Sequence, residues 1–485
     1  MMSTRGAEPR ATPHSLGKRY NESAYQQKKK QDLKKSADEG RGCVVRKMCA
    51  LRAVEFFLGC VWLCPTVFQA QQQGMSSIDR EQVAQMLRDA RDEVKKHYYD
   101  PKIKGIDWDA RYQKYAAQIP NARELGDGFR IVAGFLMGLD DSHTFFDPPH
   151  RKNEYDYGYL MGLVGDAALV THVRPKSDAE AKLHVGDQVL TINGIRVDRK
   201  GFHTVEYYFN NLAPQDSLRL IVQSPTGEQH RVIVNAAIKE GKQMLNYSDG
   251  GGSDLWDAIR HDENFIPAFR EKIVENGDVA IWRLPIFFAD PSEIVRFTAK
   301  ARKHATLILD LRGNPGGSVD TLEFLAGALF GKEVKIADPV GRNAPKPIIA
   351  KHVADPFTGK LIVLVDGNSA SAAEMLARVV QLEHRGIVIG DKSAGAVMEA
   401  KTFGDHQGTQ FVTYYGFNVT VADVLMSDGK SLEKIGVIPD EPILPTAADV
   451  AVGRDPVLAH AAELAGLKLD PIAAGKMFPF EWPPF

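Results

Sequence analysis

One serine stands at a predicted strand-to-helix turn, a setting in which a hydroxyl can act as a nucleophile. Ser371 follows an apolar run at 361–365 and precedes an alanine-rich helical stretch. Such a turn lies at the carboxyl end of a parallel sheet, where α/β proteins bind their ligands. The amide of Ala372 then points toward the position where an oxyanion forms. The alternative is a plain helix cap, because serine is a leading N-cap residue and Glu374 has capping-box spacing.

A glycine-rich turn at 310–317 has the same setting, after a predicted strand and before a predicted helix. Its adjacent Gly316 and Gly317 allow backbone amides to approach a ligand closely. This signal is weak by itself, because tight turns use glycine for conformational reasons alone. The turn lacks the Gly-x-Gly-x-x-Gly and Walker lysine patterns, which argues against a nucleotide site.

The elements that must position these turns are predicted from apolar runs. Four short continuous runs are typical of strands buried on both faces of a sheet: 279–282, 306–310, 361–365 and 387–389. Helical stretches alternate with them: 291–303, 319–330 and 372–382. This βαβ order predicts an α/β fold with a mostly parallel sheet and helices packed on it.

Two further regions precede this predicted core. An amphipathic helix is expected over 79–99, capped by Asp79 and Gln82, with five apolar residues on one face: Val83, Met86, Leu87, Ala90 and Val94. A second helical stretch follows over 122–137. Short runs that alternate apolar and polar residues then predict a small β-rich domain, and the glycines of 249–254 predict a flexible linker.

The expected organisation follows from these changes in pattern. The predicted parts are a leader at 1–74, a helical subdomain at 75–157, a β-rich domain at 158–245, a linker at 246–277, an α/β core at 278–448 and a C-terminal tail at 449–485.

The leader carries the localisation signal. Residues 1–47 are basic, polar and poorly patterned, which is typical of disorder. From Met48, a charged start, an apolar run at 53–70 and a small residue before Gln71 resemble a secretory signal. The run is below the ~20 residues that a membrane span needs. We therefore expect an exported protein, periplasmic or extracellular. Contact with a membrane is expected only through this segment, and an uncleaved anchor is the alternative. Met48 is also a candidate true start.

Composition excludes several chemistries. All 4 cysteines lie within the first 64 residues, so the rest of the chain has no cysteine nucleophile, zinc–thiolate site or disulfide. The net charge of -2 gives no global field that would favour nucleic acid.

Taken together, four segments resemble the tail-specific (C-terminal-processing) serine peptidase family. They are 310–317, 369–374, 390–395 and the closing signature at 433–440, in the family's order, and 186–194 resembles its PDZ domain. The resemblance extends from about 79 to 440. It implies a crotonase-like ββα core with an N-terminal helical subdomain and an inserted PDZ-like domain.

The sequence departs from the family pattern at one position, that of the general base. A serine hydroxyl needs such a base to act as a nucleophile at neutral pH. Members with a Ser–Lys dyad carry the lysine directly after the glycine of a Thr-Phe-Gly-Lys segment, and here the matching residue is Ala396. Lys392 and Lys401 lie nearby but out of register. We expect both to be solvated surface residues.

The chain instead resembles the tricorn-core branch of the family, in which a histidine from the helical subdomain supplies the base. Ser142 and His143 stand at that place, and Glu433 precedes the closing signature. The resemblance implies Ser371 as nucleophile, His143 as general base, and Glu433 orienting the base through Ser142. Histidine suits this role because its unperturbed pKa lies near neutrality.

The implied reaction is hydrolysis of peptide bonds through an acyl-enzyme on Ser371. The amides of Gly317, or Gly316, and of Ala372 would hold the oxyanion. The resemblance implies neither a metal nor an organic cofactor. The expected partner is a peptide or unfolded-protein substrate. The sequence leaves the oligomeric state open. One rival is a non-catalytic binding protein for apolar ligands or peptides on the same fold. A second is a crotonase-type activity on acyl thioesters.

Overall fold

The computed structural model describes residues 75–149, 151, 153–240, 272–343, 345–407 and 413–485. The predicted leader at 1–74 and the part of the predicted linker at 246–271 lie outside these described residues. Within the described ranges, no helix combines the length and the apolar character that crossing a membrane requires.

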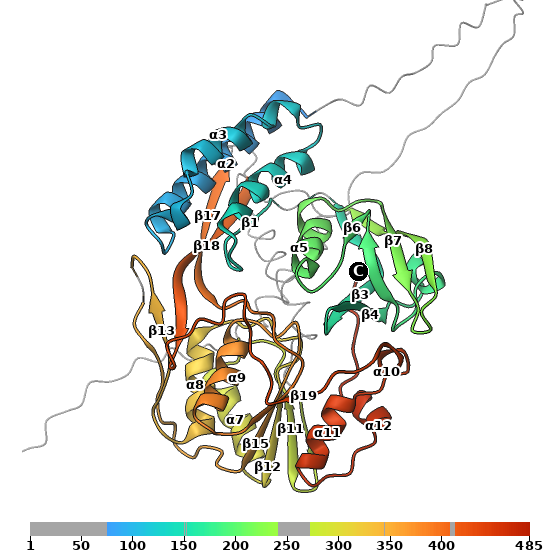
Figure 1. The fold of residues 1–485 in the computed structure, drawn as a ribbon, viewed down its shortest axis with the longest axis vertical. Coiled ribbons are helices and arrows are strands. Elements are labelled where there is room, and N and C mark those ends of the chain that lie inside the picture. Colours follow the sequence, from blue (N-terminus) through green and yellow to red (C-terminus); the bar gives the residue numbers. More distant parts are fainter. Residues whose placement is uncertain (1–74, 150, 152, 241–271, 344, 408–412) are drawn as a thin grey trace, which may run out of the picture. The chain divides into compact units, whose positions relative to one another are not determined.

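The helical subdomain begins with α2 (Ser77–His97), whose buried face consists of the five apolar residues that the sequence predicts. Its cap differs from the prediction, because Ser76 and Asp79 form the capping box and the helix starts at Ser77. The other helices are α3 (Trp108–Ala116) and α4 (Leu125–Leu136), with short 3-10 turns at Ile103–Gly105, Ile119–Asn121 and Met137–Leu139. These helices bury their apolar residues in one cluster with aromatic residues of a long strand, β18 (Thr413–Met426) (Figure 1).

The β-rich region forms one antiparallel sheet in the order β3-β4-β5-β7-β8, with β6 paired to β5. Its strands are β3 (Tyr159–Val164), β4 (Ala167–Val173), β5 (Gln188–Ile192), β6 (Ile195–Arg196), β7 (Ser217–Gln223) and β8 (Gln229–Asn235). A separate ribbon pairs β2 (Asn153–Asp156) with β9 (Ala237–Glu240). Three short helical segments complete the region: a 3-10 turn at Asp178–Ala181, α5 (Phe202–Tyr207) and a π-helical turn at Tyr208–Leu212. Its core is its own cluster of buried residues.

The predicted α/β core contains a sheet in the order β10-β11-β12-β15-β16-β19. The strands are β10 (Lys272–Asn276), β11 (Val279–Arg283), β12 (Thr306–Asp310), β15 (Lys360–Val365), β16 (Ile387–Gly390) and β19 (Glu441–Pro442). All neighbours are parallel except β10, which pairs antiparallel with β11. The four predicted strands are confirmed. The predicted linker is wrong at its end, because β10 lies inside it and already belongs to the sheet.

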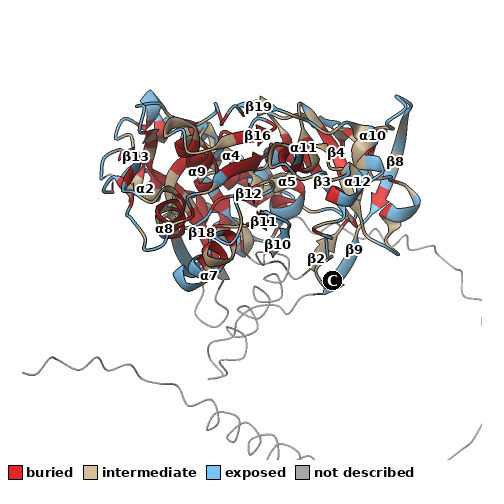
Figure 2. Ribbon diagram, turned by 90° about the horizontal axis from the view of Figure 1, so that it is seen from below, coloured by how far each residue is buried: buried red, intermediate tan, exposed pale blue. Residues whose placement is uncertain are grey.

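Helices cover both faces of this sheet. The predicted helices α7 (Pro291–Ala301), α8 (Val319–Phe330) and α9 (Ala372–Leu382) pack on the face that includes Leu307 and Leu309. The opposite face, which includes Ile308, packs on residues of α11 (Pro456–Leu464) and α12 (Pro471–Gly475). In Figure 2, buried residues gather in α8, α9 and these strands.

The sequence predicts only a tail after 449, and this segment instead closes one face of the core. Val457, Leu458 and Ala461 of α11 are buried against the sheet. A short helix, α10 (Ala447–Ala451), precedes α11. Apolar residues three or four positions apart within 456–462 are the sequence signal of this amphipathic helix. They cover the second face of the sheet, because successive side chains of each strand point to opposite faces and both faces carry apolar residues.

A second sheet has the order β1-β18-β13-β14, with β17 also paired to β18. Its other strands are β1 (Phe145–Asp147), β13 (Val334–Val340), β14 (Ile348–Ala350) and β17 (Met398–Gln407). The strand β18 spans two hydrophobic clusters, because Phe417 packs in the helical subdomain whereas Met426 packs in the α/β core. One rigid strand therefore links the subdomain that carries His143 to the core that carries Ser371.

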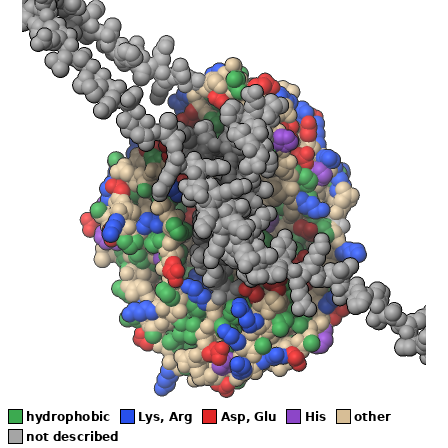
Figure 3. All heavy atoms as spheres, turned by 180° about the vertical axis from the view of Figure 1, so that it is seen from behind, with side chains coloured by type: hydrophobic (Ala, Val, Ile, Leu, Met, Phe, Trp, Pro, Cys, Tyr) green, Lys and Arg blue, Asp and Glu red, His purple; other side chains and the backbone are tan. Residues whose placement is uncertain are grey.

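The described surface carries both signs of charge. On the face drawn in Figure 3, Lys and Arg side chains are interspersed with Asp and Glu side chains. This mixture agrees with the net charge of -2.

Candidate active site

Ser371 occupies a strained turn at the start of α9. Its backbone has φ 53 and ψ -117, a combination that residues with a Cβ rarely adopt. Two acceptors hold its amide, namely the carbonyl of Ala396 at 2.9 Å and Oε2 of Glu374 at 3.1 Å. Such strain costs of order 1–3 kcal/mol and persists only where the surroundings impose it, which occurs most often at functional sites.

The glycine turn lies directly against this serine. A Cβ added at Gly316, where φ is +99, would lie 2.6 Å from Cβ of Ser371 and 3.0 Å from the amide nitrogen of Ala372. The two turns meet because β12 and β15 are parallel neighbours, with Asp310 in register with Leu364. Only glycine can therefore stand at 316 without moving the serine.

The two glycine amides have different partners. The amide of Gly316 donates to Oδ1 of Asn314 at 2.8 Å, so it already has an acceptor in this conformation, and its part in holding an oxyanion stays a prediction. The amides of Gly317 and Ala372 donate to no acceptor among the described residues. They are the two amides that remain available beside Ser371. Ala372 is the first residue of α9, where an unpaired amide and the helix dipole favour negative charge.

Ser142 and His143 lie in the turn between the 3-10 segment Met137–Leu139 and β1. Oγ of Ser142 lies 2.7 Å from Nδ1 of His143 and donates to Oε2 of Glu433 at 2.7 Å. The amide of Ser142 donates to Oε1 of the same carboxylate at 2.9 Å. Glu433, Ser142 and His143 thus form one hydrogen-bonded chain.

This chain determines the tautomer of the imidazole. The Ser142 hydroxyl has one proton, which it donates to Glu433, so its oxygen accepts a hydrogen bond from Nδ1–H of His143. The neutral imidazole then carries its lone pair on Nε2. A lone pair on Nε2 is what a general base requires.

Burial shifts the pKa values of both titrating groups toward their neutral forms. Burial lowers the pKa of His143, and the negative charge of Asp141 opposes this shift. Burial raises the pKa of Glu433, opposed by the hydrogen bonds from Ser142 and from the amide of Val397. The lowered pKa of His143 favours the neutral imidazole, which is the form that can accept a proton.

A single peptide group joins the two halves of the site. Its carbonyl, from Ala396, accepts the amide of Ser371, and its N–H, from Val397, donates to Oε2 of Glu433 at 3.0 Å. Ser371 and Glu433 therefore flank the same peptide plane. In this conformation no hydrogen bond joins Ser371 to His143, both of which are described. Contacts of this kind often tighten only when substrate binds.

Glu374 is a buried carboxylate next to Ser371, and the sequence analysis assigns it only a capping role. It is fully buried, and each of its carboxylate oxygens accepts two hydrogen bonds. Oε1 accepts from Oγ of Ser393 at 2.6 Å and the amide of Gly395 at 2.8 Å, and Oε2 accepts from the amides of Ser371 at 3.1 Å and Ala396 at 2.9 Å. Burial raises its pKa, opposed by these hydrogen bonds. The capping-box spacing was the signal that pointed to this residue.

The segment 392–401 contains the two lysines that are out of register with the family's dyad lysine. Lys392 and Lys401 are exposed, as predicted, whereas Ala396 acts through its backbone.

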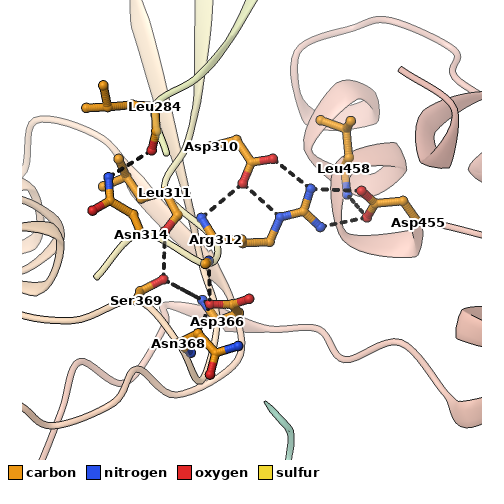
Figure 4. Close-up of polar contacts among 11 residues, drawn as sticks. Leu284, Asp310, Leu311, Arg312, Asn314, Asp366, Asn368, Ser369, Asp455 and Leu458 are labelled. Carbon is orange, nitrogen blue, oxygen red and sulfur yellow. Dashed lines mark hydrogen bonds and ion pairs between the residues drawn. The ribbon is translucent and has the colours of Figure 1, made fainter. Parts of the chain in front are cut away.

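An ion triad joins the glycine turn to the segment before α11, with Asp310 buried and Arg312 and Asp455 partly buried (Figure 4). Arg312 makes paired hydrogen bonds to Asp310 and to Asp455, which precedes α11. Burial opposes the charge on Asp310, but the Arg312 guanidinium outweighs it and holds the pKa of Asp310 below its usual range. Oγ of Ser369 also donates to the carbonyl of Leu311 at 2.8 Å, which ties the serine loop to the glycine turn. Asp455 lies in the predicted tail, so this contact could not be predicted from the sequence.

Two protein-family models match the chain. The model described as peptidase family S41 matches residues 278–443, and the model described as the tricorn protease C1 domain matches residues 79–132. The first match includes Ser371, the glycine turn and Glu433. Ser142 and His143 lie between the two matched segments.

Three curated proteins and one solved structure show the same relationship. A carboxy-terminal-processing protease of Bartonella bacilliformis is 30% identical over 370 residues, or 70% of this chain and 76% of that protein. The carboxy-terminal processing protease CtpA of Bacillus subtilis is 30% identical over 330 residues, or 65% of this chain and 63% of that protein. The tricorn protease homolog 2 of Streptomyces coelicolor is 29% identical over 413 residues, or 77% of this chain and 31% of that protein. The crystal structure of mature CPAF shares the fold, with a TM-score of 0.58 and 15% identity over 77% of this chain and 95% of that one.

The mixed α/β fold and the sequence of this chain thus both have counterparts among peptidases. The chain belongs to peptidase family S41. It spans 31% and 63% of the lengths of the Streptomyces and Bacillus relatives.

Proposed function

We propose that this member of family S41 is a serine peptidase that cleaves peptide bonds through an acyl-enzyme on Ser371. The observation that carries the proposal is the chain from Glu433 through Ser142 to His143, which leaves the lone pair of the imidazole on Nε2. A protein that only binds ligands has no use for a histidine that is held in this tautomer and connected, through Glu433 and the peptide after Ala396, to a strained serine.

The mechanism follows from the geometry. Oγ of Ser371 attacks the substrate carbonyl carbon while Nε2 of His143 takes its proton. The amides of Gly317 and Ala372 donate hydrogen bonds to the oxyanion of the tetrahedral intermediate. The imidazolium passes its proton to the leaving amine as the carbon–nitrogen bond breaks. Water then attacks the acyl-enzyme with His143 again acting as base, which releases the acid product and restores Ser371.

Glu433 stabilises the imidazolium through Ser142 rather than by direct contact. When His143 takes the serine proton, the imidazolium keeps its positive charge and donates Nδ1–H to Oγ of Ser142, whose own proton stays hydrogen-bonded to the negative carboxylate of Glu433. Hydrogen bonds to charged groups are worth about 1.5–3 kcal/mol, so this chain favours the transition state over the neutral ground state.

Two finer features of the proposal rest on the resemblance of the sequence to the tail-specific peptidase family and on the arrangement of the strands and helices. We propose that the layers of the α/β core are crotonase-like and that 158–245 is a PDZ-like domain. It would present peptide or unfolded-protein substrates to Ser371. The Bacillus and Bartonella relatives are carboxy-terminal-processing proteases by name, which supports a peptide or protein substrate. The signal-like pattern before Gln71 supports export.

A fluorophosphonate probe tests the proposal, because it labels only a serine that a neighbouring base activates. We expect the folded wild-type chain to be labelled, Ser371→Ala to lose all labelling and His143→Ala to lose most of it. Ser224→Ala is the matched control, since Ser224 lies in an exposed turn of the β-rich domain. Absence of labelling in correctly folded wild-type protein would contradict a peptidase and favour a binding protein. Persistent labelling of His143→Ala would refute the role of this base.

A further inference from the structure

The carboxylate of Asp141 is a hydrogen-bonding centre beside the proposed base. Oδ1 accepts the amides of His143 at 3.1 Å and Thr144 at 2.7 Å. These two bonds close the turn that carries the imidazole. A capping aspartate in any loop could make such local bonds, so they are not decisive by themselves.

Two further donors reach Asp141 from distant elements. The hydroxyl of Tyr98, at the end of α2, donates to Oδ2 at 2.8 Å, and Oγ1 of Thr420, in β18, donates to Oδ1 at 2.8 Å. Both donors are fully buried. Burying polar groups is costly unless each is paired, so these two residues fix the carboxylate relative to two separate elements.

The same three elements are joined a second time. The amide of Thr420 donates to Oγ1 of Thr144 at 3.1 Å, and the carbonyl of Thr420 accepts the amide of Tyr99 at 3.0 Å. The His143 turn, the end of α2 and the middle of β18 therefore form one hydrogen-bonded unit. Because β18 also packs in the α/β core, this unit determines where the imidazole stands relative to Ser371.

We propose that Asp141 is a positioning residue that holds the His143 turn against β18 and α2 in the geometry that the general base needs. This inference rests on the proposed function. Asp141 does not touch the reacting atoms and acts only through His143.

The charged groups around His143 come from two segments. Asp140 and Asp141 belong to its own turn, and Glu433 and Lys434 belong to the segment after β18. Lys434 pairs with Asp140 at 3.1 Å, and Glu433 is bound to Ser142. Asp141 is the charge that raises the pKa of His143 against the lowering effect of burial. Removing that charge destabilises the imidazolium, so the pKa of His143 must fall.

Asp141→Asn is the informative substitution, because the side chain keeps its size and loses its charge. The matched control is Asp140→Asn, one residue earlier, whose side chain is 88% exposed and pairs only with Lys434 among the described residues. The first readout is the titration of the His143 ring by NMR of histidine-labelled protein, assigned by the signal that His143→Gln lacks. The second is the pH profile of kcat/KM on a fluorogenic peptide.

We expect the His143 titration and the acid limb of kcat/KM to move to lower pH by the same amount in Asp141→Asn and not in Asp140→Asn. The plateau value of kcat should fall about tenfold to a hundredfold, the loss expected when a catalytic group shifts by up to about 1 Å. Thr420→Val removes one donor and should reproduce part of the plateau loss without the shift in pH.

Two outcomes separate the inference from the proposed function. An unchanged His143 titration in Asp141→Asn, or a fall in Tm with unaltered kinetics, would overturn the positioning role even if the wild-type enzyme is active. A shifted titration in a chain that neither hydrolyses peptides nor reacts with a fluorophosphonate would support the placement of Asp141 and refute the peptidase.

Discussion

Removing one hydroxyl, in Ser142→Ala, tests the central feature of the site. Ser142 bridges Nδ1 of His143 and Oε2 of Glu433, with both distances at 2.7 Å. Without the bridge, Nδ1–H loses its acceptor, and the carboxylate no longer interacts with the imidazolium. The backbone amide of Ser142 still donates to Glu433, so the turn itself is expected to stay in place.

The magnitude follows from the strength of the lost interaction. A hydrogen bond to a charged group is worth about 1.5–3 kcal/mol, and this one gains its charge only when His143 is protonated in the transition state. Each ~1.4 kcal/mol is tenfold in rate, so kcat should fall roughly 10-fold to 150-fold. KM should change little, because no substrate contact is removed.

A double-mutant cycle with Glu433→Gln makes the prediction specific. If Glu433 acts through Ser142, the double variant should be about as slow as the slower single variant, because the two residues act as one unit. The assay is kcat and kcat/KM on a fluorogenic peptide, together with the rate of fluorophosphonate labelling. Ser224→Ala serves as the control for loss of a serine hydroxyl elsewhere.

Two results would refute this reasoning. The first is a Ser142→Ala variant within twofold of the wild-type kcat, which would mean that Nδ1 finds an equivalent acceptor. The second is additive losses in the cycle, which would mean that Glu433 acts on the site by a separate route, such as its bond to the amide of Val397.

Three further predictions concern the support of the site. Ser371→Gly should be more stable in urea than Ser371→Ala by about 1–3 kcal/mol, because glycine relieves the positive φ while both variants lack the nucleophile; equal stability would contradict a strained turn. Gly316→Ala should abolish labelling, because its Cβ would lie 2.6 Å from that of Ser371, whereas Gly313→Ala, with open space around it, should keep labelling. Arg312→Ala should lose about 3–5 kcal/mol, since it leaves Asp310 buried without its partner, whereas the exposed Arg296→Ala should lose less than about 1 kcal/mol. The folded-state pKa of Asp310 is lowered, so its contribution is present above the unfolded value near 3.9 and is lost as pH falls through the lowered value. Urea titrations of the wild type and Arg312→Ala should therefore converge in strong acid, and a constant difference would contradict this account.

The α/β core was largely predictable because its signals are local. Strands buried on both faces appear as continuous apolar runs, so β12 begins and ends where the sequence predicts. The helices α8 and α9 also have their predicted bounds, since serine caps mark where they start. The boundaries with weak local signals were missed. The strand β10 carries charged residues, and it belongs to the sheet only through its pairing with β11. The helices after 449 are short and are separated by turns, so their periodic signal is weak.

The sequence by itself determined which chemistry is available. It placed Ser371 at a turn between a buried strand and a helix, removed the lysine base by putting Ala396 at its position, and excluded cysteine chemistry after residue 64. The first and the third of these conclusions need only the order and the type of residues, whereas the missing lysine is recognised through the resemblance to the family. The role of His143 needed the resemblance to a family as well, because one histidine among 14 has no local signature.

The tertiary structure alone decided how these groups meet. Ser142 and Glu433 are 291 residues apart, and their hydrogen bond exists because β18 carries the chain from the helical subdomain back to the core. The same packing makes Glu374 a centre of four hydrogen bonds, commits the amide of Gly316 to Asn314, and brings Asp455 to Arg312. Hydrogen-bond geometry depends on tenths of an ångström between elements distant in sequence, and that precision arises only when the folded core fixes those elements against one another.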